Sequence, residues 1–465
     1  IRFDKDGSSM GSFGKKNAFR FPEEGVIRCV LLLGCCLFYL YIAFHMGVGV
    51  QTGGPDERMR SLIPQCIVSG HILPSGYDGC AIYDTGYWSY AFYPQLLGAY
   101  VSAFFMKVAQ ILGLGVALTY PFGRLASVLF GLVTLFFVSQ TVSLALDKSK
   151  YKGVAACGSV VILGFWPQFA FLCSYMNNDI VALSGVAILM YSMVYGGKRG
   201  WDLKSVLCLS AGIVACGLGY LNSYGFVLIS VLFFIITVLS QYRENRKESW
   251  KLIFIAGGIS AILVLPFFSL NLYRYHDLLG MNVFHERQLQ WMQDTGSASP
   301  QHPWTEGLVS LLLRSNFVMD TFQSFVGNFG AMAIPIPFIF CLFFFGSLLT
   351  SFGMAVPAIC EAMKKTYWRL FGMGVLIACA ITIFLFLYYA VCVDYQAQGR
   401  YVIYLLIPMV IVSSIGVGKG LPVEKRYVRV AFYIFCLFYA FVTIWEFKSV
   451  IAIYGWNGVS ASALV

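Results

Sequence analysis

Long apolar runs separated by short polar segments make up most of this chain. The first run covers residues 25–50, and most of the others are about twenty residues long, the length that an α-helix needs to cross a bilayer. The remaining apolar runs cover 124–146, 154–173, 180–194, 204–219, 224–241, 252–270, 331–352, 370–392, 401–417 and 430–447. The pattern therefore predicts an all-α integral membrane protein with about eleven transmembrane helices.

The segment 93–114 is also apolar, but its polar residues are not scattered. At helical spacing, Gln95, Ser102, Lys107 and Gln110 fall on one arc with Ala99 and Ala103 between them, and Leu97, Phe104, Val108, Ile111 and Leu112 fall on the other. Such an amphipathic helix lies in the membrane interface with its apolar face toward the lipid. We therefore expect an interfacial helix here rather than another span.

Composition and charge support this interpretation. The chain has 465 residues, of which 58% are hydrophobic and only 12% charged, whereas a soluble protein would carry about 25% charged residues. The net charge of +10 does not indicate a nucleic-acid partner, because the basic residues cluster in short connections between the apolar runs. Such clusters are typical of cytoplasmic loops, so the N-terminus is expected in the cytoplasm and the loops 50–123 and 271–330 outside.

The domain organisation follows from the same pattern. Residues 1–24, which open at Ile1 and include the tag-like stretch 7–12, are interpreted as a cytoplasmic N-terminal segment. Residues 25–465 are interpreted as one transmembrane domain with a larger external loop after the seventh span. Most of the 14 cysteines lie inside apolar runs, where they act as small hydrophobic residues. Cys66 and Cys80 share the first external loop, where a disulfide is one possibility.

Unusual charge gathers on the expected outer face. Gly53-Gly54-Pro55-Asp56-Glu57-Arg58 follows the first span, and a carboxylate at membrane depth marks a site more often than a scaffold. A solvated charged loop is the alternative. Asp179 lies at a helix start, where a capping role is the alternative to a direct one. Arg400 and Arg274 are outer-face arginines that either reach lipid phosphate or hold an anionic ligand.

The order of several short motifs resembles one superfamily. They are the Gly-Pro-Asp-Glu-Arg loop, the stretch 175–179, Leu270-Asn271-Leu272-Tyr273-Arg274-Tyr275, Phe325-Val326-Gly327-Asn328-Phe329-Gly330, and Gln398-Gly399-Arg400-Tyr401. Together they resemble a bacterial membrane-protein family of poorly defined function that is similar to the GT-C glycosyltransferases. The resemblance implies a GT-C-like bundle that transfers a hexosyl or pentosyl group from a polyprenyl-phosphate donor to a cell-envelope glycan or other acceptor, usually with inversion. It places the active site on the outer face of a bacterial cytoplasmic membrane.

The resemblance and the residue chemistry together give a set of candidate site residues. Asp56 is the expected general base, with Glu57 as its partner or as a metal ligand. Arg58, Arg274 and Arg400 are expected to bind the donor phosphate. Asp179, Gln398, Tyr401 and His71 are expected to contact substrate. A Mg²⁺ or Mn²⁺ ion at Asp56 and Glu57 is possible. Some relatives carry an Asp-x-Asp motif tied to a divalent metal, whereas here the two acids are adjacent, and no histidine pair has the helical spacing of metal ligands.

Two other functions remain open at this stage. A transporter or flippase for a polyprenyl-linked lipid or polysaccharide would place ionisable residues near the bilayer midplane, often at broken helices. Here they collect at the outer rim, which favours an outward-facing active site. A non-catalytic GT-C-like subunit would bind the donor without turnover.

Overall fold

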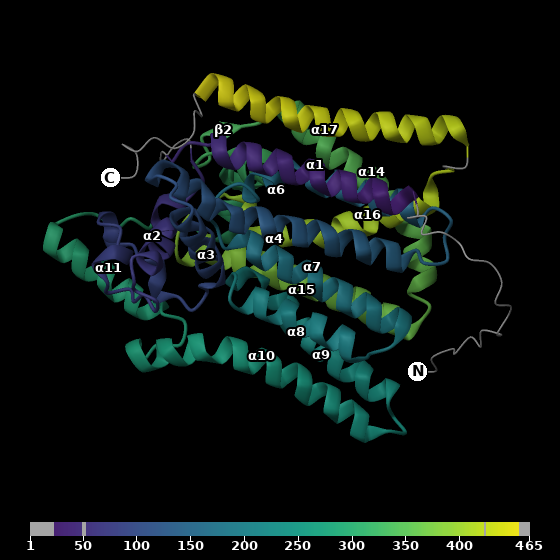
Figure 1. Ribbon diagram of the computed structural model, residues 1–465, viewed down its shortest axis with the longest axis horizontal. Helices are drawn as coiled ribbons and strands as arrows, with labels where there is room; N and C mark the ends of the chain where they lie inside the picture. Colours follow the sequence, from purple (N-terminus) through teal and green to yellow (C-terminus); the bar gives the residue numbers. More distant parts are fainter. Residues whose placement is uncertain (1–22, 49–52, 423–424, 455–465) are drawn as a thin grey trace.

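The computed structural model describes residues 23–48, 53–422 and 425–454, and almost all of its regular structure is helical. Long helices lie side by side in a bundle along the longest axis of the molecule (Figure 1). The helices of the bundle are α1 (Glu23–His45), α4 (Val116–Ala145), α5 (Lys152–Gly164), α6 (Pro167–Leu172), α7 (Asp179–Arg199), α8 (Leu203–Gly217), α9 (Tyr224–Gln241), α10 (Arg246–Tyr275), α14 (Phe338–Ala362), α15 (Thr366–Cys392), α16 (Leu406–Gly420) and α17 (Arg426–Tyr454).

The connections carry the remaining elements. These are α2 (Glu57–Val68), α3 (Leu97–Ile111), α11 (Met281–Thr295), α12 (Leu308–Arg314), α13 (Phe317–Gly327), and the antiparallel strands β1 (Asn328–Phe329) and β2 (Ile334–Pro335). Short 3-10 turns are η1 (Gly79–Ala81), η2 (Thr85–Tyr87), η3 (Tyr90–Phe92), η4 (Leu221–Ser223) and η5 (Gly399–Leu405).

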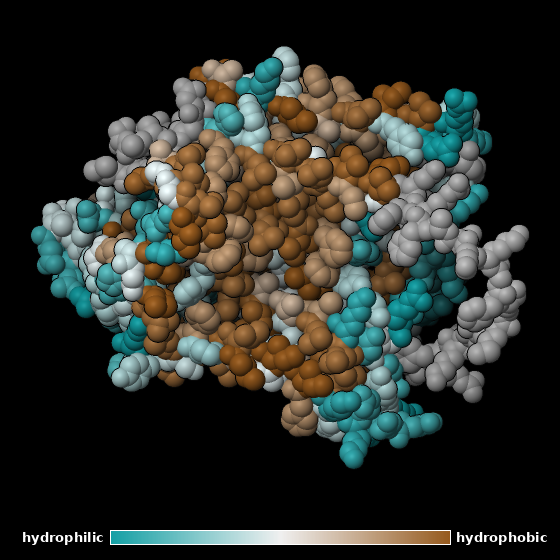
Figure 2. Space-filling view, in the orientation of Figure 1, coloured by the Kyte–Doolittle hydropathy of each residue, from teal (hydrophilic) through white to brown (hydrophobic). Residues whose placement is uncertain are grey.

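Within the described residues, nine helices are long and apolar enough to cross a membrane. The surface agrees, because a broad hydrophobic belt lies between two hydrophilic ends (Figure 2). The two other predicted spans, 154–173 and 204–219, fall on shorter helices. The run 154–173 is divided into α5 and α6, because Pro167 lacks a backbone N–H and holds Trp166 in an extended conformation. The all-helical membrane fold is thus confirmed, while the count of about eleven spans stays a prediction.

Helix α7 lies at the centre of the bundle and packs against α4 and α8. A Cβ atom at Gly185 of α7 would lie 2.7 Å from the backbone nitrogen of Cys216 in α8, so only glycine permits this approach. Close contact through small residues is the usual way in which helices associate in lipid. Helices α10 and α17 instead lie at the periphery, and most of their side chains face outward.

The polar connections α2, α3 and α11 gather at one end of the bundle (Figure 1). The predicted interfacial segment 93–114 contains α3, and the apolar residues Phe104, Ile111 and Leu112 of this segment are exposed. Ser102 differs from the expectation of a solvated polar arc, since it is buried with Ala103. Small side chains on this face allow α3 to pack on α2 and α4. Most of the residues that α3 buries are therefore small, and Met106 is the large one among them.

A disulfide joins Cys66 of α2 to Cys80 of η1, with Cα atoms 5.6 Å apart. It closes a loop whose ends are 14 residues apart in the sequence. Closure of such a loop contributes about 3 kcal/mol, chiefly by restricting the unfolded chain. We therefore expect the variant Cys66→Ser/Cys80→Ser to unfold at a lower temperature than the parent protein, as measured by thermal unfolding in detergent. Cys392→Ser, at an exposed free cysteine, is the control. An unchanged midpoint would show that the disulfide does not stabilise this end of the bundle.

Candidate active site

Asp56 occupies the position before α2 and has the left-handed backbone angle φ of 60°. This conformation is uncommon outside glycine, although aspartate tolerates it better than most residues. Its carboxylate makes no capping hydrogen bond to α2. Residues with strained backbone angles concentrate at functional sites. Because the Asp56 carboxylate does not cap α2, it is free to interact with other groups.

The carboxylate of Asp56 pairs with Arg400, although the two residues are 344 positions apart in the sequence. Arg400 Nη2 donates to Asp56 Oδ2 at 2.7 Å, and the Asp56 side chain keeps 25% of its surface exposed. Arg60, on the next turn of α2, places its guanidinium 3.9 Å from the Tyr90 ring centroid. Burial opposes the charged form of Asp56, but Arg400 and Arg60 overcome it, so the pKa of Asp56 lies below its usual value.

Arg400 is presented by η5, which packs tightly on α13. A Cβ atom at Gly399 would lie 2.1 Å from the backbone nitrogen of Phe325, so a side chain at this position would displace the backbone. The Gly399 N–H donates to Ser324 Oγ at 2.5 Å. Because Arg400 follows directly, this contact fixes the point from which its side chain extends toward Asp56.

Several buried donors around Asp56 have no acceptor. Across residues 23–48, 53–422 and 425–454, no hydrogen-bond partner is found for Arg400 Nε and Nη1, Arg60 Nε, or the Tyr175 hydroxyl. Arg400 and Arg60 are 5% and 8% exposed, and Tyr175 is fully buried. Buried guanidinium donors are rarely left unpaired, because desolvation without compensation is unfavourable. The arrangement is that of a site prepared for an anion.

Asp179, at the first position of α7, also interacts electrostatically with Arg400 and Arg60. The Tyr404 hydroxyl donates to Asp179 Oδ1 at 3.1 Å. The capping role that the sequence offered for Asp179 belongs to Asn177, whose Oδ1 accepts from the Ile180 N–H at 2.9 Å. Asp179 therefore belongs with Asp56, Arg60 and Arg400 to one group of charged side chains, the Asp56 cluster.

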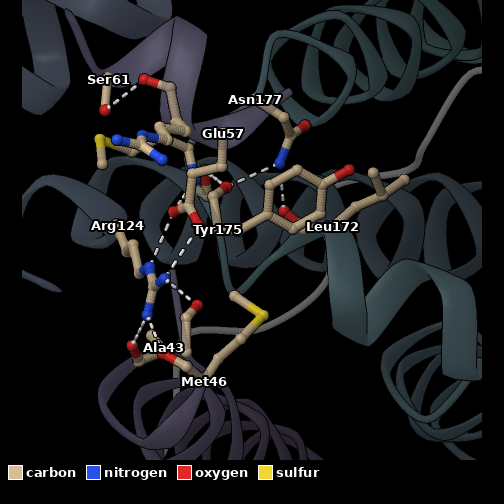
Figure 3. Close-up of polar contacts among 12 residues, drawn as sticks. Ala43, Met46, Glu57, Ser61, Arg124, Leu172, Tyr175 and Asn177 are labelled. Carbon is tan, nitrogen blue, oxygen red and sulfur yellow. Dashed lines mark hydrogen bonds and ion pairs between the residues drawn. The ribbon is translucent and has the colours of Figure 1, made fainter. Parts of the chain in front are cut away.

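Glu57 points to Arg124 (Figure 3), whereas Asp56 pairs with Arg400. It is 1% exposed, and its two oxygens accept hydrogen bonds from Arg124 at 2.7 and 2.8 Å. Glu57 Oε1 also accepts from the Met176 N–H at 3.0 Å. The adjacent acids thus bind separate arginines and do not form one catalytic pair.

The other predicted site residues are divided between the cluster and its surroundings. Tyr401 joins it, because its hydroxyl lies 3.4 Å from Arg400 Nη2. The Gln398 amide donates to Gln396 on the same segment. Arg58 is exposed and lies 5.8 Å from the Tyr83 ring centroid. Arg274 donates to the carbonyls of Leu73 and Pro74, so it braces the first loop.

His71 lies beyond the C-terminal end of α2, whereas Asp56 precedes its N-terminal end. A helix of 12 residues separates them, a distance of about 18 Å. The structure therefore places His71 with the disulfide rather than with Asp56. In the described part of the chain, Cys66, His71 and Cys80 are the one group of three potential metal ligands, and the disulfide engages both thiols.

The residues present do not fit the divalent cation considered from the sequence. Arg400 occupies one oxygen of Asp56, and Arg124 occupies both oxygens of Glu57. A hard cation requires several oxygen ligands that converge on one point. The positive charge beside Asp56 comes from Arg400 and Arg60.

An apolar groove of about 620 Å³ runs between α8, α9, α10 and α15. Tyr224 lies in its wall, and the Tyr224 hydroxyl accepts a hydrogen bond from Gln95 Nε2 at 2.8 Å. Gln95 in turn lines a small polar cavity together with Arg60. Tyr224 and Gln95 thus connect the wall of the groove with the cavity that Arg60 lines. Helix α3 borders the polar cavity and does not line this groove.

Sequence reasoning missed Arg60 and Arg124. Arg60 is four residues after Asp56, a helical spacing that could have suggested a shared face. Arg124 lies within an apolar stretch, where an ionisable residue is a functional candidate by default. Both signals were present, but neither identified the partner of the arginine.

No protein-family model matches the chain, and no curated protein matches it. Solved structures do. ArnT from Cupriavidus metallidurans bound to undecaprenyl phosphate matches with a TM-score of 0.50 and 13% identity over 91% of this chain and 70% of ArnT. The Archaeoglobus fulgidus oligosaccharyltransferase in the apo form matches with a TM-score of 0.52 and 15% identity over 91% of this chain and 56% of that one. At these identities the likeness shows the fold alone: the helical bundle of this chain is similar to those of ArnT and the archaeal oligosaccharyltransferase.

Proposed function

We propose that this protein is an inverting membrane glycosyltransferase. It transfers a sugar from a polyprenyl-phosphate donor to an extracytoplasmic cell-envelope glycan or other acceptor. Its N-terminus lies in the cytoplasm, and the end of the bundle that carries α2, α3 and α11 faces the outer side of a bacterial membrane. The basic connections between the transmembrane helices support this orientation.

One observation carries the proposal. A carboxylate that is partly accessible, Asp56, lies beside two buried arginines whose remaining donors have no acceptor among the residues that the structure describes. Attack of a hydroxyl on an anomeric carbon needs a base, and departure of a lipid phosphate needs positive charge. The cluster supplies both within a few side chains.

The residues support a single displacement. Asp56 accepts the proton of the acceptor hydroxyl as its oxygen bonds to the anomeric carbon, while the bond from that carbon to the phosphate oxygen breaks. The electron pair leaves with the lipid phosphate, whose growing charge Arg400 and Arg60 stabilise. No proton donor is needed for the leaving group, because the phosphate is stable as an anion.

The apolar groove supports a polyprenyl carrier. Its lining includes Leu228, Val264 and Phe268, and its wall reaches the Arg60 cavity through Tyr224 and Gln95. A polyprenyl tail in the groove would bring its phosphate toward the arginines. Burial of apolar surface would then hold the donor without any contact to the sugar.

The experiment that tests the function supplies purified protein with a panel of short-chain polyprenyl-phosphate sugars and measures the release of lipid phosphate. We expect release from one donor class, both with and without a chelator. If the chelator stopped the release, the protein would require a metal, and Arg400 and Arg60 would not be the sole source of positive charge for the leaving phosphate. No release from any donor, together with lipid movement in proteoliposomes, would favour the flippase. Donor binding without release would indicate the non-catalytic subunit.

The sequence assigned Arg58 to the donor phosphate, whereas Arg60 lies beside Asp56, and substitution of each arginine distinguishes the two assignments. Arg60→Met should lower kcat/KM for the donor by about 10²-fold, because it removes a buried donor of positive charge beside the leaving group. Arg58→Met should change it much less, since Arg58 is exposed and faces Tyr83. Steady-state kinetics of both variants measure the difference. A larger loss from Arg58→Met would restore the assignment made from the sequence.

A further inference from the structure

All three nitrogens of the Arg124 guanidinium, on α4, donate hydrogen bonds to other parts of the chain (Figure 3). Nε and Nη2 donate to the two oxygens of Glu57 at 2.7 and 2.8 Å. Nη1 donates to the carbonyls of Ala43 and Met46, and Nη2 to that of Gly47. These carbonyls lie at the C-terminal end of α1, where helices leave their acceptors unpaired. Arg124 thus joins α1, α2 and α4.

The same network reaches the turn before Asp179. Glu57 accepts from the Met176 N–H at 3.0 Å. Ser127, one turn after Arg124, donates to the Tyr175 carbonyl at 2.6 Å. Asn177 donates to the carbonyls of Leu172 and Tyr175, both at 2.7 Å, and closes the turn upon itself. The turn is therefore anchored from two sides, and Asp179 follows it directly.

Asp56 is bonded to Glu57 in the chain, and its left-handed backbone allows little adjustment. The place of the Asp56 carboxylate is consequently set by the place of Glu57. Displacement of a reacting group by about 1 Å can lower a rate by about 10²-fold. An anchor that fixes Glu57 and Met176 together thus controls the distance of Asp56 and Asp179 from their arginines.

We propose that Arg124 and Glu57 are positioning residues that hold Asp56 and the turn before Asp179 in register for catalysis. The inference rests on the proposed function and reassigns Glu57, which acts through Asp56 and does not contact substrate. A purely structural ion pair would stabilise the bundle as a whole. A positioning pair also changes turnover in protein that remains folded.

The experiment compares Arg124→Lys and Glu57→Gln/Arg124→Gln with the parent in lipid nanodiscs. Lysine keeps the charge but cannot reach all five acceptors of Arg124. Removal of one partner alone would leave an unpaired buried charge and strongly destabilise the protein. The double variant avoids this because it removes both charges. Lys198→Met is the control, because its ion pair with Asp147 lies on the connection after α4 and is partly exposed. The readouts are the folded fraction, kcat and donor KM per folded molecule, and hydrogen exchange of peptides that cover 53–61 and 174–179.

We expect kcat per folded molecule to fall about 10²-fold in both test variants, with donor KM changed less than about threefold. Faster exchange should be confined to the two peptides, and Lys198→Met should show neither effect. Unchanged kcat in folded protein, or faster exchange spread over the bundle, would overturn the inference. If the parent itself transfers no sugar, the proposed function fails while the exchange data alone decide the positioning role.

Discussion

Asp56→Asn should lower sugar transfer by about 10³-fold while the protein folds and inserts normally. Asparagine has the size and shape of aspartate and also tolerates the left-handed conformation of this position. It cannot take a proton from the acceptor hydroxyl, so the loss should appear in kcat. Release of lipid phosphate by the purified variant, compared with the parent in the same assay, measures it.

Asp84→Asn is the matched control for this prediction. Asp84 lies in the same external loop and is exposed, so removal of its charge tests whether any acid in the loop would give the same loss. We expect near-normal turnover from it. If Asp56→Asn instead kept turnover within about threefold of the parent, Asp56 would not be the base, and Asp179 would be the next carboxylate to test.

The fold could be predicted because lipid imposes a strong rule on sequence. Every long span must be apolar and helical, so hydropathy alone locates α1, α7 and α15. The helical break at Trp166 and Pro167 had a signal in the proline, but the apolar run around it suggested one continuous span. The burial of Ser102 was not predictable from amphipathicity, because a small polar residue suits a helix contact as well as it suits water.

The candidate site was only half visible in the sequence. Asp56 was found because a carboxylate at the end of a membrane span is unusual. Its neighbour Glu57 looked equivalent, yet the left-handed turn at Asp56 sends the two side chains to Arg400 and Arg124. Pairings between residues hundreds of positions apart leave no mark in one sequence. The sequence identified Arg400 as an unusual arginine on the outer face and missed Arg124, and the partners of both depend on how the helices pack.

Arg400→Met should be as damaging as the loss of the base, because Arg400 serves the reaction twice. Its unpartnered Nε and Nη1 are placed to hold the leaving phosphate, and removal of such a donor typically lowers kcat by about 10²–10³-fold. It also pairs with Asp56 at 2.7 Å. After burial, which raises the pKa of Asp56, Arg400 is the largest influence on that carboxyl and lowers its pKa.

The second role gives this variant a signature in pH. A base with a lowered pKa stays deprotonated at neutral pH, so the parent should lose activity only below the ordinary aspartate pKa of about 3.9. Without Arg400, burial is opposed mainly by Arg60, and the pKa of Asp56 should rise. Residual activity of Arg400→Met should therefore begin to fall at higher pH than that of the parent.

The profile of kcat/KM between about pH 3 and pH 8 covers the acid limbs of both proteins and shows in which direction the limb of Arg400→Met is displaced. The stability of the protein should follow the same direction, because a carboxylate with a lowered pKa stabilises the fold above its unfolded pKa and loses that contribution as the pH falls through its folded pKa. Arg60→Met is the matched comparison, since it removes the second arginine and leaves the ion pair between Asp56 and Arg400 in place. A large loss in Arg400→Met with an unshifted acid limb would mean that Arg400 binds phosphate but does not tune Asp56. The base would then owe its charge at neutral pH to Arg60 and to its own partial exposure.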